Sequence, residues 1–395
     1  EYERMRHYVA MSIYLSAGWA VLMTIGLGIA NEPILRLMNY KDSIMPDVKA
    51  YMGIIYAGLI VTAAYNALAA FLRALGDSKS PLYFLIISAV INVGLDVAFI
   101  IYGGMGVEGC AYATVIAQGI SAVLCFIYIV KKFPILHLKK ENFRFSLPAC
   151  GKLMALGVPM ALQFSITAIG TMMVQSALNI LGSYAVAAFT AGNKIENIFT
   201  QAYVALGTTM ATYNAQNVGA RKLDRVRSGF NCAHIMGVIY AIVTGVIIFF
   251  FGKYFSYLFI SDNAAEVIPM VDIYVKCVAV FFIPLHFVNV LRNGIQGMGY
   301  GLLPMLAGVA ELTGRGVTAT VAAAHKSYFG ACMASPVAWI LAGGAHHTAF
   351  SYDLTAEQMG DWAASMGIEA VYIDKDTTIR QFKNELLWNS VAFRK

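Results

Sequence analysis

Charged residues are scarce in this sequence. Only 13% of its 395 residues are Asp, Glu, Lys or Arg, whereas 59% are hydrophobic; in a soluble domain about a quarter of the residues are charged. This scarcity excludes an ordinary water-soluble protein and indicates one embedded in a lipid bilayer. Cysteine is also rare, and the six cysteines show neither the spacing of a zinc site nor a disulfide framework. The net charge of +6 requires no nucleic-acid partner, because loop cations set the topology of membrane proteins.

Long apolar runs are what the sequence has instead. Nine of them are long enough to cross a bilayer as helices, and a tenth is short and interrupted by Pro336. The 19 methionines and the many aromatic residues suit packed helices better than an alternating lipid-facing barrel. The sequence therefore predicts an all-α polytopic membrane protein. The runs cover about 8–30, 51–72, 81–102, 109–130, 153–181, 185–212, 229–251, 270–291, 303–324 and 329–342.

Basic residues are divided unevenly between alternate loops. Fifteen, from Arg4 to Arg292, fall on one side of the predicted membrane, and five fall on the other. Because Lys and Arg collect on the cytoplasmic side, we expect a multi-pass protein of the cell membrane with its N-terminus in the cytoplasm. The basic linker 131–152 is expected on the same side, and it separates two lobes.

Three short stretches recur at a nearly constant offset. Such matches in order indicate two lobes of the same topology, as in some transporters. Residues 152–221 make two helices of the second lobe that have no counterpart in the first, so we expect the chain to lack the first two of six helices in lobe one. The matches pair Leu72–Pro81 with Ile295–Pro304, Gly109–Ala113 with Gly330–Ala334, and Glu1–Arg6 with Lys222–Arg227.

Two polar residues interrupt the apolar run from Pro81 to Tyr102. Asn92 and Asp96 are four residues apart and therefore share one face of a helix. An ionisable side chain inside a membrane helix is expensive and often marks an ion or substrate path. A structural hydrogen bond to a neighbouring helix is the alternative interpretation.

Further polar side chains lie in the apolar runs of the second half, where they are expected to line a substrate cavity or to hold the helices of the lobe together. Glu311 and Arg315 are four apart and are expected to form a buried ion pair. Lys194 and Glu196 are two apart, do not face each other, and should each have another partner. The set is Gln163, Gln175, Asn179, Lys194, Glu196, Glu311 and Arg315.

Several of these stretches together carry a family resemblance: Leu72–Pro81, Asn92–Asp96, Gly106–Thr114, Gly157–Pro159, Asn193–Glu196, Gln216–Ala220 and Pro304–Arg315. From residue 1 to about 340 the chain resembles the multidrug and toxic-compound extrusion (MATE) family. The resemblance implies a two-lobed helix bundle with about ten of the family's twelve transmembrane helices. It also implies a monomeric antiporter, not an enzyme, that exports small amphipathic or cationic compounds in exchange for Na⁺ or H⁺ and has no cofactor. The expected truncation would impair this transport.

The resemblance also implies a cation site. Asn92, Asp96 and Thr114 match three ligands of the site in some family members, and the fourth, an acidic residue on the first helix, would precede Glu1. Na⁺ prefers such oxygen ligands, and a partly desolvated carboxylate can also take up a proton, so both ions remain open. A further glutamate of some members corresponds to Thr167, so no carboxylate cation site is expected in the second lobe.

The end of the chain changes character. Trp339–Thr348 and Phe382–Asn389 resemble the C-terminal end of bacterial L-arabinose isomerase over about residues 339–394. His347 matches a Mn²⁺ ligand of that family, but one histidine cannot hold the metal alone, so it is expected to be a relic that binds none. A chimeric gene, a misassembled sequence or a fused reading frame would each produce this junction, and a small α/β tail is expected.

These observations predict four segments: an incomplete N-lobe over 1–130 with helices 3–6 of the family, the linker 131–152, a C-lobe over 153–342 with helices 7–12, and an isomerase-like remnant over 343–395. Two other functions stay open. One is an isomerase fragment on a membrane anchor. The other is a flippase for lipid-linked oligosaccharides or polysaccharides.

Overall fold

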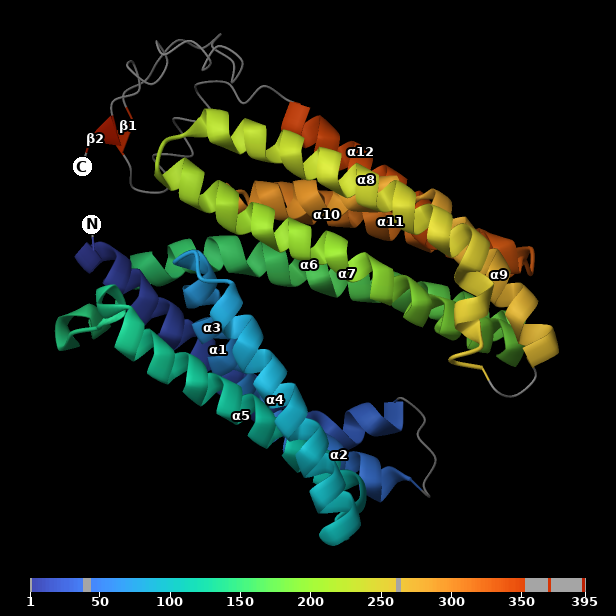
Figure 1. Ribbon diagram of the computed structural model, residues 1–395, viewed down its shortest axis with the longest axis horizontal. Helices are drawn as coiled ribbons and strands as arrows, with labels where there is room; N and C mark the ends of the chain where they lie inside the picture. Colours follow the sequence, from blue (N-terminus) through green and yellow to red (C-terminus); the bar gives the residue numbers. More distant parts are fainter. Residues whose placement is uncertain (1, 38–43, 261–263, 352–368, 371–392, 395) are drawn as a thin grey trace. The chain divides into compact units, whose positions relative to one another are not determined.

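Helices account for almost all of the described chain (Figure 1). The computed structural model describes residues 2–37, 44–260, 264–351, 369–370 and 393–394. The chain divides into two compact units, Glu1–Leu153 and Met154–Lys395. Each of the ten apolar runs in the sequence corresponds to one helix or to one bent pair of helices, which confirms the expected all-α membrane fold.

The described residues of the first unit form five longer helices and three short helical turns. Its longest helix, α1, keeps Pro33 inside its last turns. After α4 the chain continues directly into a π-helix, η1. The elements are α1 (Tyr2–Leu37), α2 (Met45–Ala57), α3 (Leu59–Ala74), α4 (Lys79–Val97), η1 (Ala98–Tyr102), α5 (Gly106–Lys132), η2 (Pro134–Leu136) and η3 (Lys140–Phe143).

In the described part of the second unit there are seven helices, of which the first begins in the last residues of unit 1. They are α6 (Leu147–Leu181), α7 (Ser183–Gly219), α8 (Leu223–Ser256), α9 (Ala264–Val280), α10 (Phe282–Gly297), α11 (Leu302–Ala324) and α12 (Tyr328–Ser351). In the tail, β1 (Glu369–Ala370) pairs antiparallel with β2 (Phe393–Arg394).

The internal repeat of the sequence is confirmed by the order of the helices. Helices α1 to α5 begin at residues 2, 45, 59, 79 and 106, and α8 to α12 begin 219 to 223 residues later, at 223, 264, 282, 302 and 328. The bends repeat as well: α2 and α3 meet at 42° around Gly58, and α9 and α10 meet at 55° around Phe281. Each half therefore contains the same bent span at the same place.

The turn that follows the bent pair is also repeated. Gly76 has φ +87° and Gly299 has φ +97°, both in the left-handed region that glycine adopts without strain. The next amide in each turn reaches back to the helix, from Asp77 to Leu72 O at 2.9 Å and from Tyr300 to Ile295 O at 3.3 Å. This Schellman-type ending explains why the LRALG and IQGMG stretches match each other.

Six helices and the two bent pairs are apolar and long enough to cross a membrane. Helices α7 and α11 are not among these, although they are 37 and 23 residues long. They carry the charged residues Glu196, Glu311 and Arg315, and both face the interior of the second unit. These two helices thus bring charged side chains to the polar cavity of this lobe.

The last long helix differs from the expected one. The run 329–342 was expected to end at Ala342, but α12 continues to Ser351, so residue 343 lies inside a helix. Ala338 and Ala342 are fully buried, and a Cβ on Gly343 would lie 3.6 Å from Val288 of α10. Packing against the lobe keeps this glycine-containing stretch helical despite a cost of about 1 kcal/mol per glycine. Most of the expected α/β tail lies outside the described residues.

Candidate functional site

Asn92 and Asp96 lie in the last turns of α4, where the helix passes into the π-helix η1. Both residues are half-buried. Among the described residues, Asn92 Nδ2 and Asp96 Oδ1 are buried atoms without a hydrogen-bond partner. A buried polar atom without a partner costs about 1–3 kcal/mol, more for a charged group, so it needs a compensating role. A π-helical turn beside such a pair is common at functional sites.

Thr114, the third expected ligand, lies in α5 and is half-buried. Its hydroxyl donates to the carbonyl of Cys110 at 2.9 Å, within its own helix. No hydrogen bond joins it to Asn92 or Asp96 in the described part of the chain. Helices α4 and α5 do pack together, and the hydroxyl of Ser88 donates to Ala117 O across them at 2.5 Å.

Asp77, in the turn between α3 and α4, has a structural role instead. Its carboxylate accepts hydrogen bonds from the Ser80 amide at 3.0 Å, the Ser80 hydroxyl at 2.8 Å and the Tyr128 hydroxyl at 2.9 Å. Burial alone raises the pKa of this carboxyl, but the bonds from Ser80 and Tyr128 and the charge of Lys132 outweigh it and hold the pKa below 3.8. The aspartate of the LRALGDSKSP stretch therefore fixes the start of α4.

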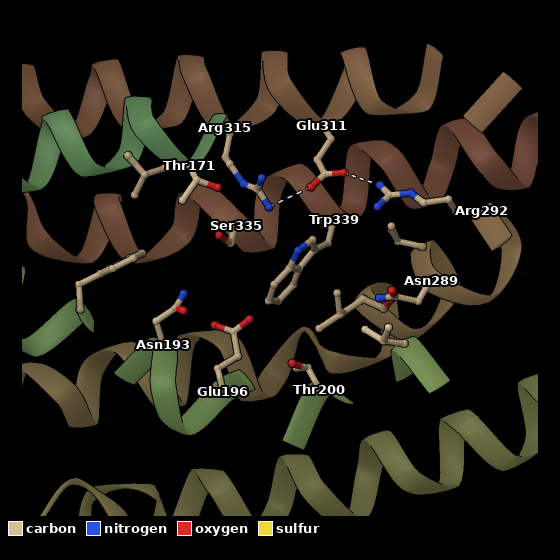
Figure 2. A pocket seen from close by; sticks show the side chains of 15 residues that line it. Thr171, Asn193, Glu196, Thr200, Asn289, Arg292, Glu311, Arg315, Ser335 and Trp339 are labelled. Carbon is tan, nitrogen blue, oxygen red and sulfur yellow. Dashed lines mark hydrogen bonds and ion pairs between the residues drawn. The ribbon is translucent and has the colours of Figure 1, made fainter. Parts of the chain in front are cut away.

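A cavity of about 240 Å³ lies inside the second unit, between α6, α7, α10, α11 and α12 (Figure 2). Its lining mixes charged, amide, hydroxyl and aromatic side chains. The lining residues are Thr171, Val174, Phe189, Asn193, Glu196, Thr200, Val204, Leu285, Val288, Asn289, Arg292, Glu311, Arg315, Ser335 and Trp339.

One wall of the cavity is cationic. Glu311 of α11 accepts from Arg292 Nη2 of α10 at 2.5 Å and from Arg315 Nη2, one turn further along α11, at 2.9 Å. Figure 2 shows both contacts. Two guanidinium groups therefore share one carboxylate, and the wall has a net charge of +1. Gln163 of α6 supports this wall: when its side-chain oxygen is turned toward Arg292, that oxygen accepts a hydrogen bond from Arg292 Nε at 2.8 Å.

The opposite wall is formed by α7 and has one acidic side chain, with a formal charge of −1. Glu196 accepts a hydrogen bond from the hydroxyl of Tyr274, a fully buried residue of α9. The same hydroxyl lies 3.4 Å from Asn193 Nδ2. Within the described residues Glu196 takes part in no ion pair, unlike Glu311. In Figure 2 its carboxylate lies across the cavity from Glu311 and Arg292.

One aromatic side chain lies between the two charged walls, and another belongs to the wall formed by α7. Trp339 of α12 is only 4% exposed, and Figure 2 shows its indole between Glu196 and Glu311. Phe189 of α7 packs edge-to-face against Tyr274 with ring centroids 4.7 Å apart. The cavity thus offers two opposite charges separated by an apolar, aromatic middle.

The seven polar residues expected to line a cavity or hold the lobe together divide into groups. Glu196, Glu311 and Arg315 line the cavity, and Gln163 lies behind its cationic wall. Gln175 and Asn179 are exposed and bond to each other at 3.1 Å. Lys194 is exposed, with its ammonium 5.8 Å from the Phe259 ring.

The expected pairings of charged residues have a clear outcome. The ion pair between Glu311 and Arg315 is confirmed, and Glu196 has a partner other than Lys194, as expected. Arg292 was wrongly counted among the cytoplasmic loop cations. It lies inside α10, its side chain is only 15% exposed, and it completes the pair with Glu311. Its place in an amphipathic helix could have signalled this, because a loop cation is not flanked by buried residues such as Leu291.

Tyr274 and Trp339 were missed altogether. Each occupies an ordinary position in an apolar run, and only the folded lobe brings Tyr274 to Glu196 and Trp339 to the cavity. His347 lies in α12, but its side chain is outside the described part. Among the described residues, no group of three or more His, Cys, Asp or Glu side chains could hold a metal ion.

Comparison with known proteins decides the family. The MatE family model matches residues 1–98 and 158–317, which is more than half of the chain. The chain belongs to the MatE family. Its sequence is 32% identical to the probable multidrug resistance protein YpnP of Bacillus subtilis over 309 residues, 75% of this chain and 67% of that protein. It is 25% identical to the probable multidrug resistance protein NorM of Thermotoga maritima over 75% of this chain and 64% of that protein. The chain spans 58% of YoeA of Bacillus subtilis, another probable multidrug resistance protein.

Solved structures share the MATE fold. A transporter of the MOP superfamily from Pyrococcus furiosus, described as having a binding pocket of reverse polarity, matches with a TM-score of 0.82 and 19% identity, over 87% of this chain and 77% of that one. An outward-facing multidrug resistance MATE transporter matches with a TM-score of 0.80 and 20% identity, over 87% of this chain and 78% of that one. The membrane-embedded, multi-pass helical fold is therefore shown.

A second, smaller match confirms the composite character of the chain. The model of the L-arabinose isomerase C-terminal domain matches residues 319–369, which begins upstream of residue 339, where the resemblance was expected to start. L-arabinose isomerase 1 of Bacillus licheniformis is 65% identical over 60 residues, 15% of this chain and 12% of that enzyme. Most of the chain thus resembles transporters, and the isomerase-like part includes all of α12 and Trp339.

Proposed function

We propose that this MATE-family chain exports small amphipathic or cationic compounds and couples their export to Na⁺ or H⁺ at Asp96. It would act as a monomer in the cytoplasmic membrane, with its N-terminus on the cytoplasmic side. The two repeated lobes support alternating access, because a pair of like units is the usual framework of such transporters. The named relatives, described as multidrug resistance proteins, support the substrate class.

The observation that carries the coupling proposal is the state of Asp96. Its Oδ1 atom is buried and has no hydrogen-bond partner among the described residues, and Asn92 Nδ2, one turn away, is in the same condition. A bound Na⁺ would satisfy the carboxylate oxygen, with the Asn92 side-chain oxygen as a second ligand; a proton would satisfy it equally. Thr114 of the neighbouring α5 is the proposed third ligand.

The repeat supports a coupling role for one lobe only. Positions of α4 and α11 correspond at an offset of 223 residues, so Asn92 corresponds to Arg315 and Asp96 to Ala319. In the second lobe the position of Asn92 is thus occupied by a cation that already has Glu311 as its partner. A second cation-binding site at this place of α11 would face a fixed positive charge.

Reconstituted vesicles test the coupling. We expect an outward flux of a lipophilic fluorescent cation that is driven by an imposed Na⁺ or proton gradient, and we expect Asp96→Asn to abolish its dependence on the gradient. Asp47→Asn is the matched control, because Asp47 is exposed and near a helix start. Gradient-driven flux that is equal in Asp96→Asn and the parent chain would refute the role of Asp96.

The isomerase-like segment has a different proposed role. Within it, α12 packs against α11, where a Cβ on Gly314 would lie 3.2 Å from Ala338 Cα, and Ala331, Cys332, Ala334 and Ala338 are fully buried. These contacts support a structural role as the last helix of the transporter lobe. Purified chain supplied with Mn²⁺ should show no conversion of L-arabinose, and measurable conversion would instead favour the isomerase alternative.

A further inference from the structure

The ionisable residues that line the cavity of unit 2 balance one another. Arg292 and Arg315 contribute two positive charges, and Glu196 and Glu311 contribute two negative charges. The charges are not evenly placed, however. Glu311 is committed to both guanidinium groups, whereas Glu196 has only the hydroxyl of Tyr274 as its partner among the described residues. The cavity therefore has a negative wall on α7 and a positive wall on α10 and α11.

The separation of these walls is built into the lobe. The ion pairs of Glu311 hold both arginines on their own side, and the bond from Tyr274 holds Glu196 on the other side. Trp339 lies between them in the view of Figure 2.

We propose that this cavity binds a small zwitterion, with its cationic group at Glu196, its anionic group at Arg292, and an apolar or aromatic body against Trp339. Arg292 is the more accessible arginine, with 15% of its side chain exposed against 9% for Arg315. A cavity of about 240 Å³ has room for a molecule of amino-acid size. This inference deepens the proposed export function and rests on it for its biological meaning.

Charge balance separates a zwitterion from the other ligand classes. A ligand without net charge leaves the cavity neutral, as it is when empty. A simple cation or anion would bring an additional net charge into a lobe of low dielectric constant, and one charged wall would remain without a partner. Each charged hydrogen bond contributes about 1.5–3 kcal/mol, which corresponds to roughly 10- to 100-fold in affinity.

Three compounds that share a phenethyl skeleton test the proposal on the full chain in detergent. They are L-phenylalanine, which carries both charges; phenethylamine, which lacks the carboxylate; and 3-phenylpropionate, which lacks the ammonium. Equilibrium binding of radiolabelled L-phenylalanine is measured, and the other two compounds compete with it. We expect each competitor to bind at least 10-fold more weakly than L-phenylalanine.

Variants test the roles of Glu196 and Trp339. Glu196→Gln should weaken the binding of L-phenylalanine about 10-fold or more. The binding of 3-phenylpropionate should stay unchanged or become tighter. Trp339→Phe keeps an aromatic ring and should retain binding, whereas Trp339→Ala should weaken the binding of all three compounds. Asp272→Asn is the control, because Asp272 pairs with Lys276 at 2.5 Å and does not line the cavity. Unfolding temperatures identify any variant that fails to fold.

The outcomes are decisive in each direction. Phenethylamine binding as tightly as L-phenylalanine would show a simple cation site, and 3-phenylpropionate doing so would show an anion site; either result overturns the proposal. Absence of L-phenylalanine binding to the folded parent chain also overturns it. The measurement uses no membrane and no ion gradient, so a failure of coupling at Asp96 cannot produce a failure here.

Discussion

Arg292 and Glu311 form an ion pair of 2.5 Å that joins α10 to α11. The second oxygen of Glu311 lies 2.9 Å from Arg315, so one carboxylate holds two guanidinium groups in place. The Glu311 side chain is only 4% exposed. The pair connects the bent span of the second lobe to the helix that follows it, and it forms the positive wall of the cavity.

Replacing Glu311 by Gln should destabilise the protein strongly. The amide cannot neutralise two buried guanidinium groups, and an uncompensated buried charge costs about 3–5 kcal/mol. Thermal or denaturant unfolding in detergent measures the loss. Glu108→Gln removes an exposed carboxylate near the start of α5 and should cost less than about 1 kcal/mol. Equal losses of stability in the two variants would show that the ion pairs of Glu311 contribute no more to stability than an exposed carboxylate does.

Replacing Gly192 by Ala should disturb the negative wall. A Cβ at this position of α7 would lie 2.3 Å from Cδ1 of Tyr274, the residue that holds Glu196. Such overpacking costs about 1–3 kcal/mol. Gly157→Ala in α6 is the matched control, since nothing lies within 4 Å of a Cβ there, and it should be neutral or stabilise by up to about 1 kcal/mol. Unfolding temperatures of both variants check the difference, and a neutral Gly192→Ala contradicts this packing.

Asp77→Asn should change the acid stability of the first lobe. The folded-state pKa of Asp77 lies below the ordinary 3.8, so its contribution to stability is fully present above that pH and is lost as the pH falls through the folded pKa. The variant should therefore be less stable than the parent chain at neutral pH and should approach it at lower pH. Unfolding measured from pH 7 to pH 3 tests this, and a stability difference that does not shrink on acidification counts against it.

Because of the backbone conformation at two turns, substitutions there should change the stability of the protein in opposite directions. Gly299 has φ +97°, so Gly299→Ala should cost about 1–2 kcal/mol through strain. Lys326, between α11 and α12, has φ +49°, so Lys326→Gly should relieve strain and stabilise by about 1 kcal/mol. Unfolding temperatures in detergent report both effects. Destabilisation by Lys326→Gly would show that the lysine side chain contributes more than its backbone strain costs.

The sequence alone predicted the helices well, because the length and hydropathy of a membrane helix are set by the bilayer and not by distant contacts. It also predicted the repeat, since turns such as Gly76 and Gly299 need the same backbone conformation and hence the same residue. The pair of Glu311 and Arg315 was predictable from spacing within one helix. Arg292 was not, because its partner lies 19 residues away on another helix.

For the candidate sites too, some residues can be recognised from the sequence and others only from the packed structure. Asn92 and Asp96 are visible in the sequence because polar groups in an apolar run are rare and costly. Tyr274 and Trp339 look like any other apolar residues there, and only the packing of α9 and α12 brings Tyr274 to Glu196 and Trp339 to the cavity. By itself the sequence determined the membrane fold, its two like halves and the carboxylate of α4. The tertiary structure decided which charges meet and which face each other across a cavity, because contacts between helices depend on how the side chains of all of them pack together.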